Sequence, residues 1–259
     1  MADYSKITQD FLDSSQYQER SILEYERVYG ENFVSPGGLE LAREMIGRME
    51  LPQGSTVLDV GCGLGGGAFV MASEFGFTVD GIDLSRNMLR LANKKLAQNG
   101  LSGSVSLDWG DCLALDRSDA YDGVYSRDVF LHIHDKVRLF SVLKAALHQG
   151  GKLLFTDYCC GPGPWNAEFS AYVADRGYSL HTIEDYTGLI ADAGFAQVTG
   201  EDITPRFMEI LHADLHRIGR LDLGQAARSK LKQSWQQKLE RATAGHHRWG
   251  LFTALNEER

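Results

Sequence analysis

The chain has 259 residues, and 43% of them are hydrophobic, which is enough to form the core of one large domain. Its formal net charge of -9 argues against a general nucleic-acid-binding protein, which needs a basic surface to displace counterions. The start, MADYSKITQDF, has no apolar signal region, and no stretch approaches the length of a membrane span. We therefore expect a cytoplasmic monomer with no nucleic-acid partner.

Residues 1–50 do not follow a sheet pattern and are predicted to form a helical lead that ends in a turn at SPGG. Helices placed before a first strand can fold over the carboxyl edge of an open α/β sheet, where ligands bind. We expect this lead to act as a lid over residues 51–259. For any single aromatic residue of the lead, packing against the domain is a simpler interpretation than contact with a ligand. Those residues are Tyr17, Tyr25, Tyr29 and Phe33.

A glycine-rich turn follows the first predicted strand. Residues 56–67 read TVLDVGCGLGGG, an apolar, β-branched run that leads into five glycines. Glycine lets the backbone turn tightly and approach a ligand, and a carboxylate one strand over can accept hydrogen bonds from ribose hydroxyls. Asp83 stands at the end of the next apolar run, so the pattern favours a nucleoside cofactor over a structural turn.

The rest of the chain alternates between periods of two and 3.6, which predicts a mostly parallel sheet with helices on both faces. Two of the strands deliver Asp111, Arg127 and Asp128 to one rim of this sheet. The predicted elements are strand 56–60, helix 66–75, strand 77–82, a helix capped by Ser85 and ending at Asn99, strands 105–109 and 122–126, helix 135–151, strand 152–158, a helix carrying Tyr172 and Arg176, helix 184–194, strand 196–201, a helical insertion at about 205–245 and a last strand at 248–255.

The cysteines and histidines do not form a metal-binding pattern. None of the four cysteines has CxxC spacing, and the adjacent pair, Cys159 and Cys160, is poorly placed to bridge or to share a metal. His132 and His134 supply two ligands without a third in a matching motif. We expect reduced, mostly buried thiols and no metal.

Several segments resemble a known enzyme family. The motifs VLDVGCGLGGG and GID, with the aspartate of GDC, resemble the cofactor site of class I S-adenosylmethionine-dependent methyltransferases. The segments SQYQERSILEYERVYGENFVSPGG, YSRDVFLHIHDK, TDYC, YVADRGYSLH and KLERATAGHHRWGLF are similar to phosphoethanolamine N-methyltransferases, especially the second catalytic half of the plant enzymes and the single-domain protozoan enzymes. The resemblance runs from about Phe11 to Asn256.

This resemblance implies a class I methyltransferase (Rossmann-like) fold, with S-adenosylmethionine as cofactor and S-adenosylhomocysteine as its product. It also implies methylation of phosphoethanolamine or its mono- and dimethyl derivatives toward phosphocholine. The implied catalytic pair is Tyr17 and His132. The implied substrate contacts are Gln16, Tyr25, Asp128, Tyr158, Tyr172, Arg176, Tyr178 and Lys238. The cofactor contacts, to which the glycine turn adds Gly63, are Val34, Ser35, Asp59, Gly61, Asp83, Leu84, Asp111, Cys112 and Arg127.

The implied chemistry gives these residue types a task. Methyl transfer to nitrogen needs a free lone pair, whereas an alkyl ammonium has a pKa of about 10. His132 can accept the proton at working pH, and Tyr17 can bridge it to the amine. Asp128 can hold the ammonium, while Arg176 and Lys238 supply a planar fork and a point charge for a phosphate.

Other interpretations stay open at this point. A methyltransferase for another small amine, such as sarcosine, or for another small nucleophile would keep Asp83 but would not need Arg176 or Lys238. A Rossmann-like oxidoreductase or a non-catalytic nucleotide binder is a third possibility, although GCGLGGG lacks the strict GxGxxG placement. From the residues alone, the simpler interpretation of Arg176 is a surface salt bridge. The simpler interpretation of His132 is a core or surface histidine whose hydrogen bonds are satisfied within the protein. Pro36 stands where the protozoan enzymes carry serine, which leaves the conformation of the lid open.

Overall fold

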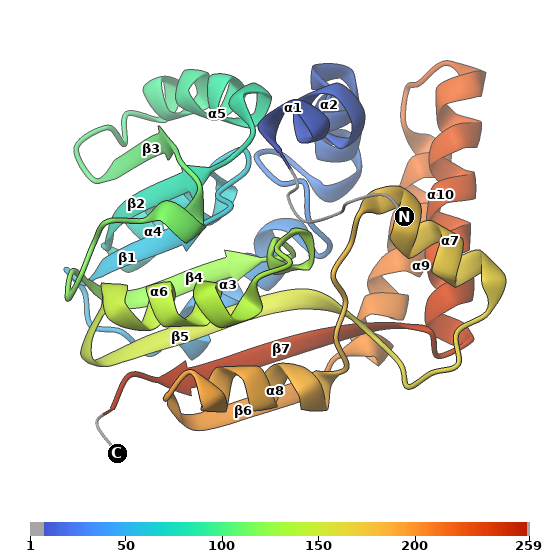
Figure 1. The fold of residues 1–259 in the computed structure, drawn as a ribbon. Helices are drawn as coiled ribbons and strands as arrows, with labels where there is room; N and C mark the ends of the chain where they lie inside the picture. The colour runs from blue at the N-terminus through green and yellow to red at the C-terminus, as the bar shows by residue number, and fades with distance from the viewer. Residues whose placement is uncertain (1–7, 258–259) are drawn as a thin grey trace.

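The computed structural model describes residues 8–257; residues 1–7, where the expected lid begins, and residues 258–259 lie outside them. In the described part, seven strands form one sheet in the order β3-β2-β1-β4-β5-β7-β6 (Figure 1). The strands are β1 (Thr56–Val60), β2 (Thr78–Asp83), β3 (Val105–Trp109), β4 (Tyr121–Arg127), β5 (Leu147–Cys160), β6 (Ala196–Asp202) and β7 (His247–Leu255).

The helices follow the predicted alternation. They are α1 (Gln9–Phe11), α2 (Glu19–Tyr29), α3 (Gly38–Arg48), α4 (Gly66–Phe75), α5 (Arg86–Asn99), α6 (Lys136–Ala146), α7 (Ala167–Arg176), α8 (Ile183–Asp192), α9 (Thr204–Arg220) and α10 (Gln225–Thr243), with single turns η1 (Leu12–Gln16), η2 (Cys112–Ala114) and η3 (Phe130–His132). The helical insertion predicted before the last strand is the pair α9 and α10.

The sheet direction places the site. Strands β1 to β5 pair in parallel, and β7 runs antiparallel between β5 and β6. In the register of β1, Val60 pairs with Ile82 on one side and with Ser126 on the other. The residues that directly follow these positions therefore gather at one edge of the sheet, as expected for parallel strands.

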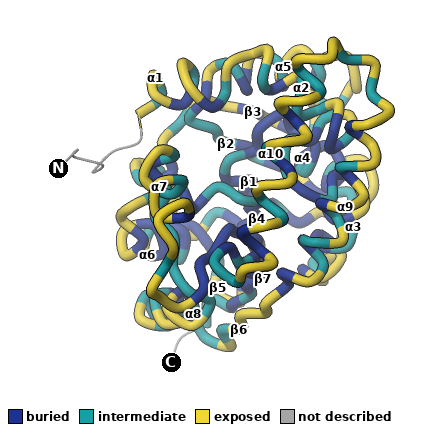
Figure 2. Tube along the Cα trace, turned by 90° about the vertical axis from the view of Figure 1, so that its right-hand side faces the viewer, coloured by how far each residue is buried: buried dark blue, intermediate teal, exposed yellow. Residues whose placement is uncertain are grey.

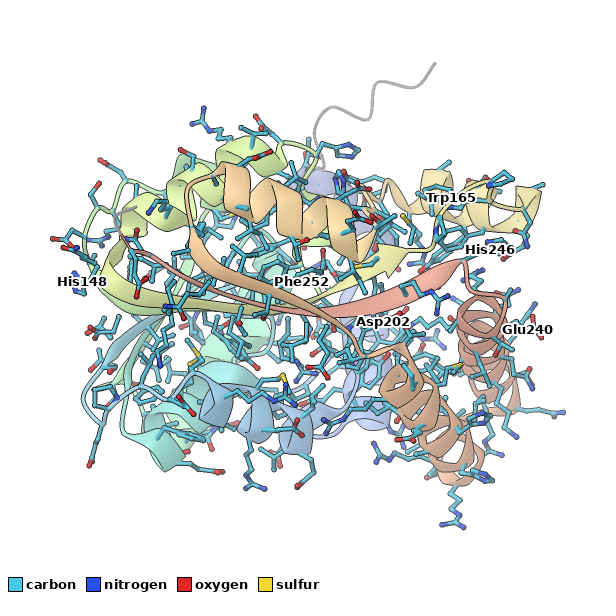
Figure 3. All side chains as sticks on the ribbon, turned by 90° about the horizontal axis from the view of Figure 1, so that it is seen from below. His148, Trp165, Asp202, Glu240, His246 and Phe252 are labelled. Carbon is cyan, nitrogen blue, oxygen red and sulfur yellow. The ribbon has the colours of Figure 1, made fainter. Side chains whose placement is uncertain are left out.

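Two helical layers cover the sheet (Figure 3). One hydrophobic cluster joins residues of α3, α4 and α5 to β1, β2 and β3, and a second joins α6 and α8 to β4, β5 and β7. In the second cluster the ring of Phe155 stacks on Phe252 at 4.7 Å between centroids and lies 4.8 Å from Phe130. Figure 2 shows the buried residues along the central strands and the exposed ones on the outer helices.

Local signals set the ends of several helices. Helix α5 begins where the Ser85 hydroxyl accepts the Met88 N–H, and it ends at Gly100, whose φ of 67° is left-handed. Helix α4 begins after Gly65 and ends at Gly76, both also left-handed. These ends confirm the predicted cap and stop of α5 and the predicted bounds of α4.

The helix predicted at 135–151 is too long, and the strand predicted at 152–158 is too short. Helix α6 ends at Ala146, and Leu147 is already the first residue of β5, where it pairs with Tyr121 of β4. Gly150 and Gly151 exchange backbone hydrogen bonds with Asn256, at 2.7 and 2.9 Å. Pairing with distant segments thus overrides the helical pattern of this stretch. At its other end β5 continues to Cys160 because it pairs there with β7.

The lead packs closely on the domain. Lys95 of α5 forms an ion pair of 2.6 Å with Glu26 of α2, and both side chains are less than one-fifth exposed. On the other side, α2 contacts α9 of the insertion. All four cysteines are buried and free, as predicted. Within residues 8–257, helices of the length and apolarity needed to cross a membrane are absent.

Phe155 provides a test of the core. The Phe155→Ala variant removes a fully buried ring from contact with Phe130 and Phe252. We expect the free energy of unfolding to fall by about 3–5 kcal/mol in chemical denaturation, from lost burial and the cavity left behind. Val137, which is 69% exposed, supplies the control. We expect Val137→Ala to change the free energy of unfolding by less than about 0.5 kcal/mol. Equal effects of the two substitutions would contradict this account of the core.

Candidate active site

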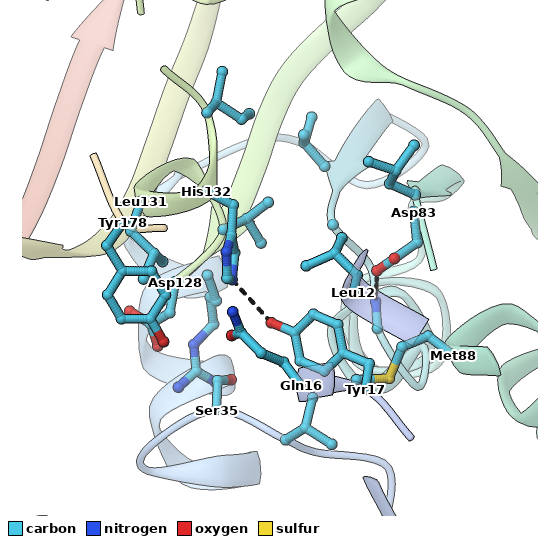
Figure 4. A pocket seen from close by; sticks show the side chains of 18 of the residues that line it. Leu12, Gln16, Tyr17, Ser35, Asp83, Met88, Asp128, Leu131, His132 and Tyr178 are labelled. Atoms are coloured by element: carbon cyan, nitrogen blue, oxygen red, sulfur yellow. Dashed lines mark hydrogen bonds between the residues drawn. The ribbon is translucent and has the colours of Figure 1, made fainter. Parts of the chain in front are cut away.

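A cavity of about 830 Å³ opens at the carboxyl edge of the sheet and is lined by residues of the lead, the strand ends, α7 and α10. Figure 4 shows part of its wall from close by. Nearly all predicted site residues meet in its wall. They are Gln16, Tyr17, Tyr25, Val34, Ser35, Gly61, Gly63, Asp83, Leu84, Asp111, Cys112, Arg127, Asp128, His132, Tyr158, Tyr172, Arg176, Tyr178 and Lys238. Asp59 is not among the lining residues.

The glycine turn and Asp83 form one end of the cavity. Asp83 accepts the Gly63 N–H at 2.9 Å on one oxygen and the Ser85 N–H at 2.8 Å on the other. Gly61 has a left-handed φ of 71°, and a Cβ there would lie 2.2 Å from a methyl of Val129. Burial raises the pKa of Asp83 to about 6. Each carboxylate oxygen keeps a lone pair, so the group can still accept hydrogen bonds from a ligand hydroxyl.

Asp59 lies behind this wall. It is 3% exposed, and its Oδ2 lies against α4, where a Cβ added at Gly67 would be 3.2 Å from it. Burial, with a further contribution from Asp83, raises the pKa of Asp59 to about 7. In the structure Asp59 supports the helix that carries the glycine turn, and its direct contact with a cofactor stays a prediction.

Arg127 fixes the turn of the lead. Its guanidinium donates to the carbonyl of Gly38 at 3.1 Å and to that of Pro36. The proline at position 36 is therefore compatible with an anchored turn, because only its carbonyl is used. Asp111 caps η2 by accepting the Leu113 N–H at 2.9 Å. Contacts of Arg127 and Asp111 with a cofactor stay predictions.

Tyr17 and His132 form a hydrogen-bonded pair across the cavity, with 3.1 Å between the Tyr17 hydroxyl and His132 Nε2 (Figure 4). Tyr17 follows η1, whereas His132 ends η3, so the pair joins the lead to the domain. Burial, assisted by Lys136 and Arg176, lowers the pKa of His132 to about 3, and burial raises the pKa of Tyr17. At neutral pH the imidazole is therefore neutral and the phenol protonated. The His132 Nδ1 atom is buried without a hydrogen-bond partner among the described residues.

Asp128 presents one free carboxylate oxygen. Its Oδ1 accepts from the Trp249 indole at 2.7 Å and from the Thr156 hydroxyl at 3.2 Å. Its Oδ2 is buried and, among residues 8–257, has no hydrogen-bond partner. The backbone of Asp128 is left-handed, with φ at 58°, a conformation that aspartate tolerates better than most residues. A buried carboxylate with an open oxygen is suited to receive a cationic ligand group.

Two cationic side chains, Arg176 and Lys238, also line the cavity. Lys238 Nζ lies 3.3 Å from the Tyr29 hydroxyl, and burial together with Arg176 lowers the pKa of Lys238 to about 8. In the described part of the chain, neither Lys238 nor Arg176 has a carboxylate oxygen within 4.0 Å, so the salt-bridge interpretation of Arg176 is wrong. Two partly buried cations without a carboxylate partner among the described residues favour an anionic ligand.

Sequence reasoning missed some lining residues. Tyr29 was noted only as an aromatic of the lead, yet it binds Lys238. Arg241 stacks on the ring of Tyr172 at 3.7 Å and forms an ion pair of 2.6 Å with Glu168. Arg241 stands three residues after Lys238, and that helical spacing was a signal that both share one face of α10.

The chain is similar to known proteins of one enzyme family. Residues 51–242 match the family model for a methyltransferase domain. The chain is 44% identical to phosphoethanolamine N-methyltransferase 1 of Arabidopsis thaliana, over 95% of this chain and 51% of that protein. It is 32% identical to phosphoethanolamine N-methyltransferase of Plasmodium falciparum, with 94% of each chain covered. The chain thus spans about half the length of the plant relatives.

A solved structure extends the likeness to the whole described fold. It is phosphoethanolamine N-methyltransferase 2 of Haemonchus contortus, in complex with phosphomonomethylethanolamine and S-adenosylhomocysteine. The TM-score is 0.93 at 34% identity, over 100% of this chain and 61% of that chain. This likeness confirms the predicted class I methyltransferase fold. On this evidence the chain belongs to the phosphoethanolamine N-methyltransferase family.

Proposed function

We propose that the protein transfers a methyl group from S-adenosylmethionine to the nitrogen of phosphoethanolamine, or of its mono- or dimethyl derivative, toward phosphocholine. One observation carries this proposal. A single cavity holds a Tyr17–His132 pair, an open oxygen of Asp128 and two cations, Arg176 and Lys238, which form no ion pair with a carboxylate of the described residues. An amine with a phosphate tail complements these groups in both charge and chemistry. The activity named for the relatives supports the same assignment.

The cofactor end has a suitable set of groups. We propose that Asp83 accepts hydrogen bonds from ribose hydroxyls and that the backbone of Gly61 and Gly63 lets the cofactor approach. S-adenosylmethionine would supply a methyl group activated by a sulfonium. Val34 and Ser35 of the lead, with Leu84 and Cys112, would complete the enclosure.

Deprotonation of the amine is the main chemical task of the protein. At pH 7 only about one alkyl ammonium in a thousand has its lone pair free, a deficit worth about 4 kcal/mol. Neutral His132 holds a lone pair, and the Tyr17 hydroxyl bonded to it can relay the proton. Burial and Lys136 lower the pKa of His132 more than Arg176 does, and a phosphate bound at Arg176 would offset the contribution of Arg176. The substrate would thereby make its own base stronger.

This arrangement accounts for the proton and for both electron pairs in the proposed methyl transfer. The amine proton passes toward Tyr17 and His132, the nitrogen lone pair forms the new C–N bond, and the C–S electron pair stays on sulfur. Asp128 Oδ2 would receive the ammonium before transfer and keep the nitrogen in place. Tyrosine rings suit the product, because their faces attract a cation that has lost its N–H donors.

The lead has a direct part in the site. Gln16 donates to the backbone carbonyl of Arg176 at 3.0 Å, and Asp13 accepts from the Ser85 hydroxyl at 2.5 Å. We propose that residues 1–50 act as a lid on a catalytic domain formed by residues 51–259, because one catalytic group, Tyr17, comes from this segment. From the sequence we also propose a cytoplasmic monomer without a nucleic-acid partner.

Removal of the base should mainly lower turnover. We expect His132→Ala to reduce kcat by about 10²–10⁴-fold, with a much smaller change in KM, because the proton acceptor is lost while the binding groups remain. Methyl transfer to phosphoethanolamine and its methylated forms measures both constants. His148 is exposed and paired with Asp119, so His148→Ala serves as the control. Unchanged turnover of His132→Ala would exclude His132 as the base.

Removal of the guanidinium should mainly weaken substrate binding. We expect Arg176→Ala to raise the KM for the phosphobase about 10- to 100-fold, as for loss of a charged hydrogen-bond partner worth about 1.5–3 kcal/mol. Parallel assays with ethanolamine and sarcosine measure the preference for a phosphate. Arg43→Ala, which removes an exposed ion pair with Glu74, is the control. A wild-type enzyme that uses ethanolamine as well as its phosphate ester would refute the proposed substrate class.

Lys238 predicts a pH dependence. Its pKa is lowered to about 8, so the ammonium is charged below pH 8 and neutral above it. We expect kcat/KM for the phosphobase to fall as the pH rises through about 8, because that constant reports ionisation of the free enzyme. Profiles from pH 6.5 to 9.5 for the wild type and Lys238→Arg test this, since arginine stays charged throughout. The same alkaline limb in both enzymes would show that Lys238 is not its source.

A further inference from the structure

Trp235 lies next to Lys238 but is not itself among the residues that line the cavity. Its side chain is fully buried on α10, and Lys238 Nζ lies 4.5 Å from the centre of its ring. The rings of Tyr25 and Tyr29, both of α2, lie 5.8 and 5.4 Å from it. One indole thus touches three groups of the cavity wall that come from two different helices.

Asp214 holds this indole from the other side. It is a buried residue of α9, and its Oδ2 accepts the Trp235 indole N–H at 3.2 Å. Its Oδ1 lies 3.7 Å from the guanidinium of Arg217, which also donates to the carbonyl of Val28 in α2. Helices α2, α9 and α10 therefore meet at this point, and α9 and α10 run side by side in Figure 1.

Lys238 needs such a support. A lysine side chain is flexible, and its ammonium is a strongly hydrated point charge. In the described structure no carboxylate lies within 4.0 Å of Lys238, so the indole face and the Tyr29 hydroxyl are what fix its position. A cation held over an indole face keeps its N–H donors free on the other side.

We propose that Trp235, oriented by Asp214, is a positioning residue that sets Lys238, Tyr25 and Tyr29 as one surface for the substrate phosphate. This proposal rests on the proposed function, because it requires a phosphorylated substrate. Trp235 touches no reacting atom. It acts on binding through the three groups that contact it.

The charges around Lys238 give the proposal a signature. The pKa of Lys238 is lowered by burial and by Arg176 of α7 and Arg241 of α10, whereas Asp214 of α9 and Asp128 after β4 raise it. Tyr29 of α2 adds a neutral hydroxyl. Removal of the Asp214 charge should therefore lower the pKa of Lys238 below about 8, even if the hydrogen bond to the indole is kept.

The first test separates binding from turnover. We expect Trp235→Phe to raise the KM for phosphoethanolamine roughly tenfold, with kcat and the KM for S-adenosylmethionine changed less than about twofold. Trp165→Phe is the matched control. The Trp165 ring packs on Phe169 and its indole N–H donates to the Gly161 carbonyl, but Trp165 does not line the cavity. Wild-type KM in Trp235→Phe, or an equal rise in Trp165→Phe, would overturn the proposal.

The second test uses Asp214→Asn, which keeps the size of the side chain and an acceptor for the indole. In Asp214→Asn, we expect the fall of kcat/KM for the phosphobase at alkaline pH to begin at a lower pH than in the wild type. In the double variant Asp214→Asn/Lys238→Arg, we expect this alkaline fall to disappear. An unmoved limb would overturn the proposal even if Trp235→Phe does not fold. Wild-type assays with ethanolamine and phosphoethanolamine separate the two failures. If the wild type uses ethanolamine and phosphoethanolamine equally well, the proposed function is wrong. If it prefers phosphoethanolamine but the variants behave like the wild type, only the proposed role of Trp235 and Asp214 is wrong.

Discussion

Desolvation of unpaired charges is the constraint on which this site depends. Arg176 and Lys238 line a cavity and form no ion pair with a carboxylate within residues 8–257, and Asp128 keeps an open oxygen in the same space. Charges withdrawn from water are unfavourable unless paired, so the cavity offers charged groups that a zwitterionic ligand can pair at both ends. The same burial keeps His132 neutral, and the site therefore combines recognition of charge with a free lone pair.

The sheet accounts for the meeting of these groups, and the surrounding helices account for their orientation. Parallel strands bring the glycine turn, Asp83 and Asp128 to one edge. The lead adds Tyr17 from one side, and α10 adds Lys238 from the other. None of these elements holds the whole site, so the chemistry arises from their packing rather than from one motif.

The sequence was a good guide where signals are local. The ends of α4 and α5 follow from glycines and from the Ser85 cap, and were predicted. The end of helix α6 was predicted wrongly because pairing of Leu147 with Tyr121 is not visible in a local pattern. The contact of Asp128 with Trp249 spans 121 residues, and no spacing rule indicates it. The sequence also does not indicate which way a side chain points: Asp59 lies against Gly67 of α4 and is not among the residues that line the cavity, and its contact with a cofactor stays a prediction.

The position of β7 has a consequence for how the protein is made. This strand is the last along the chain, yet it inserts between β5 and β6 and brings the Trp249 indole to Asp128. A ribosome delivers β1 to β4, with the glycine turn, long before it delivers Trp249. The nascent chain therefore contains the glycine turn and Asp83 early, whereas the Asp128 carboxylate has its hydrogen bond from Trp249 only after β7 has been made.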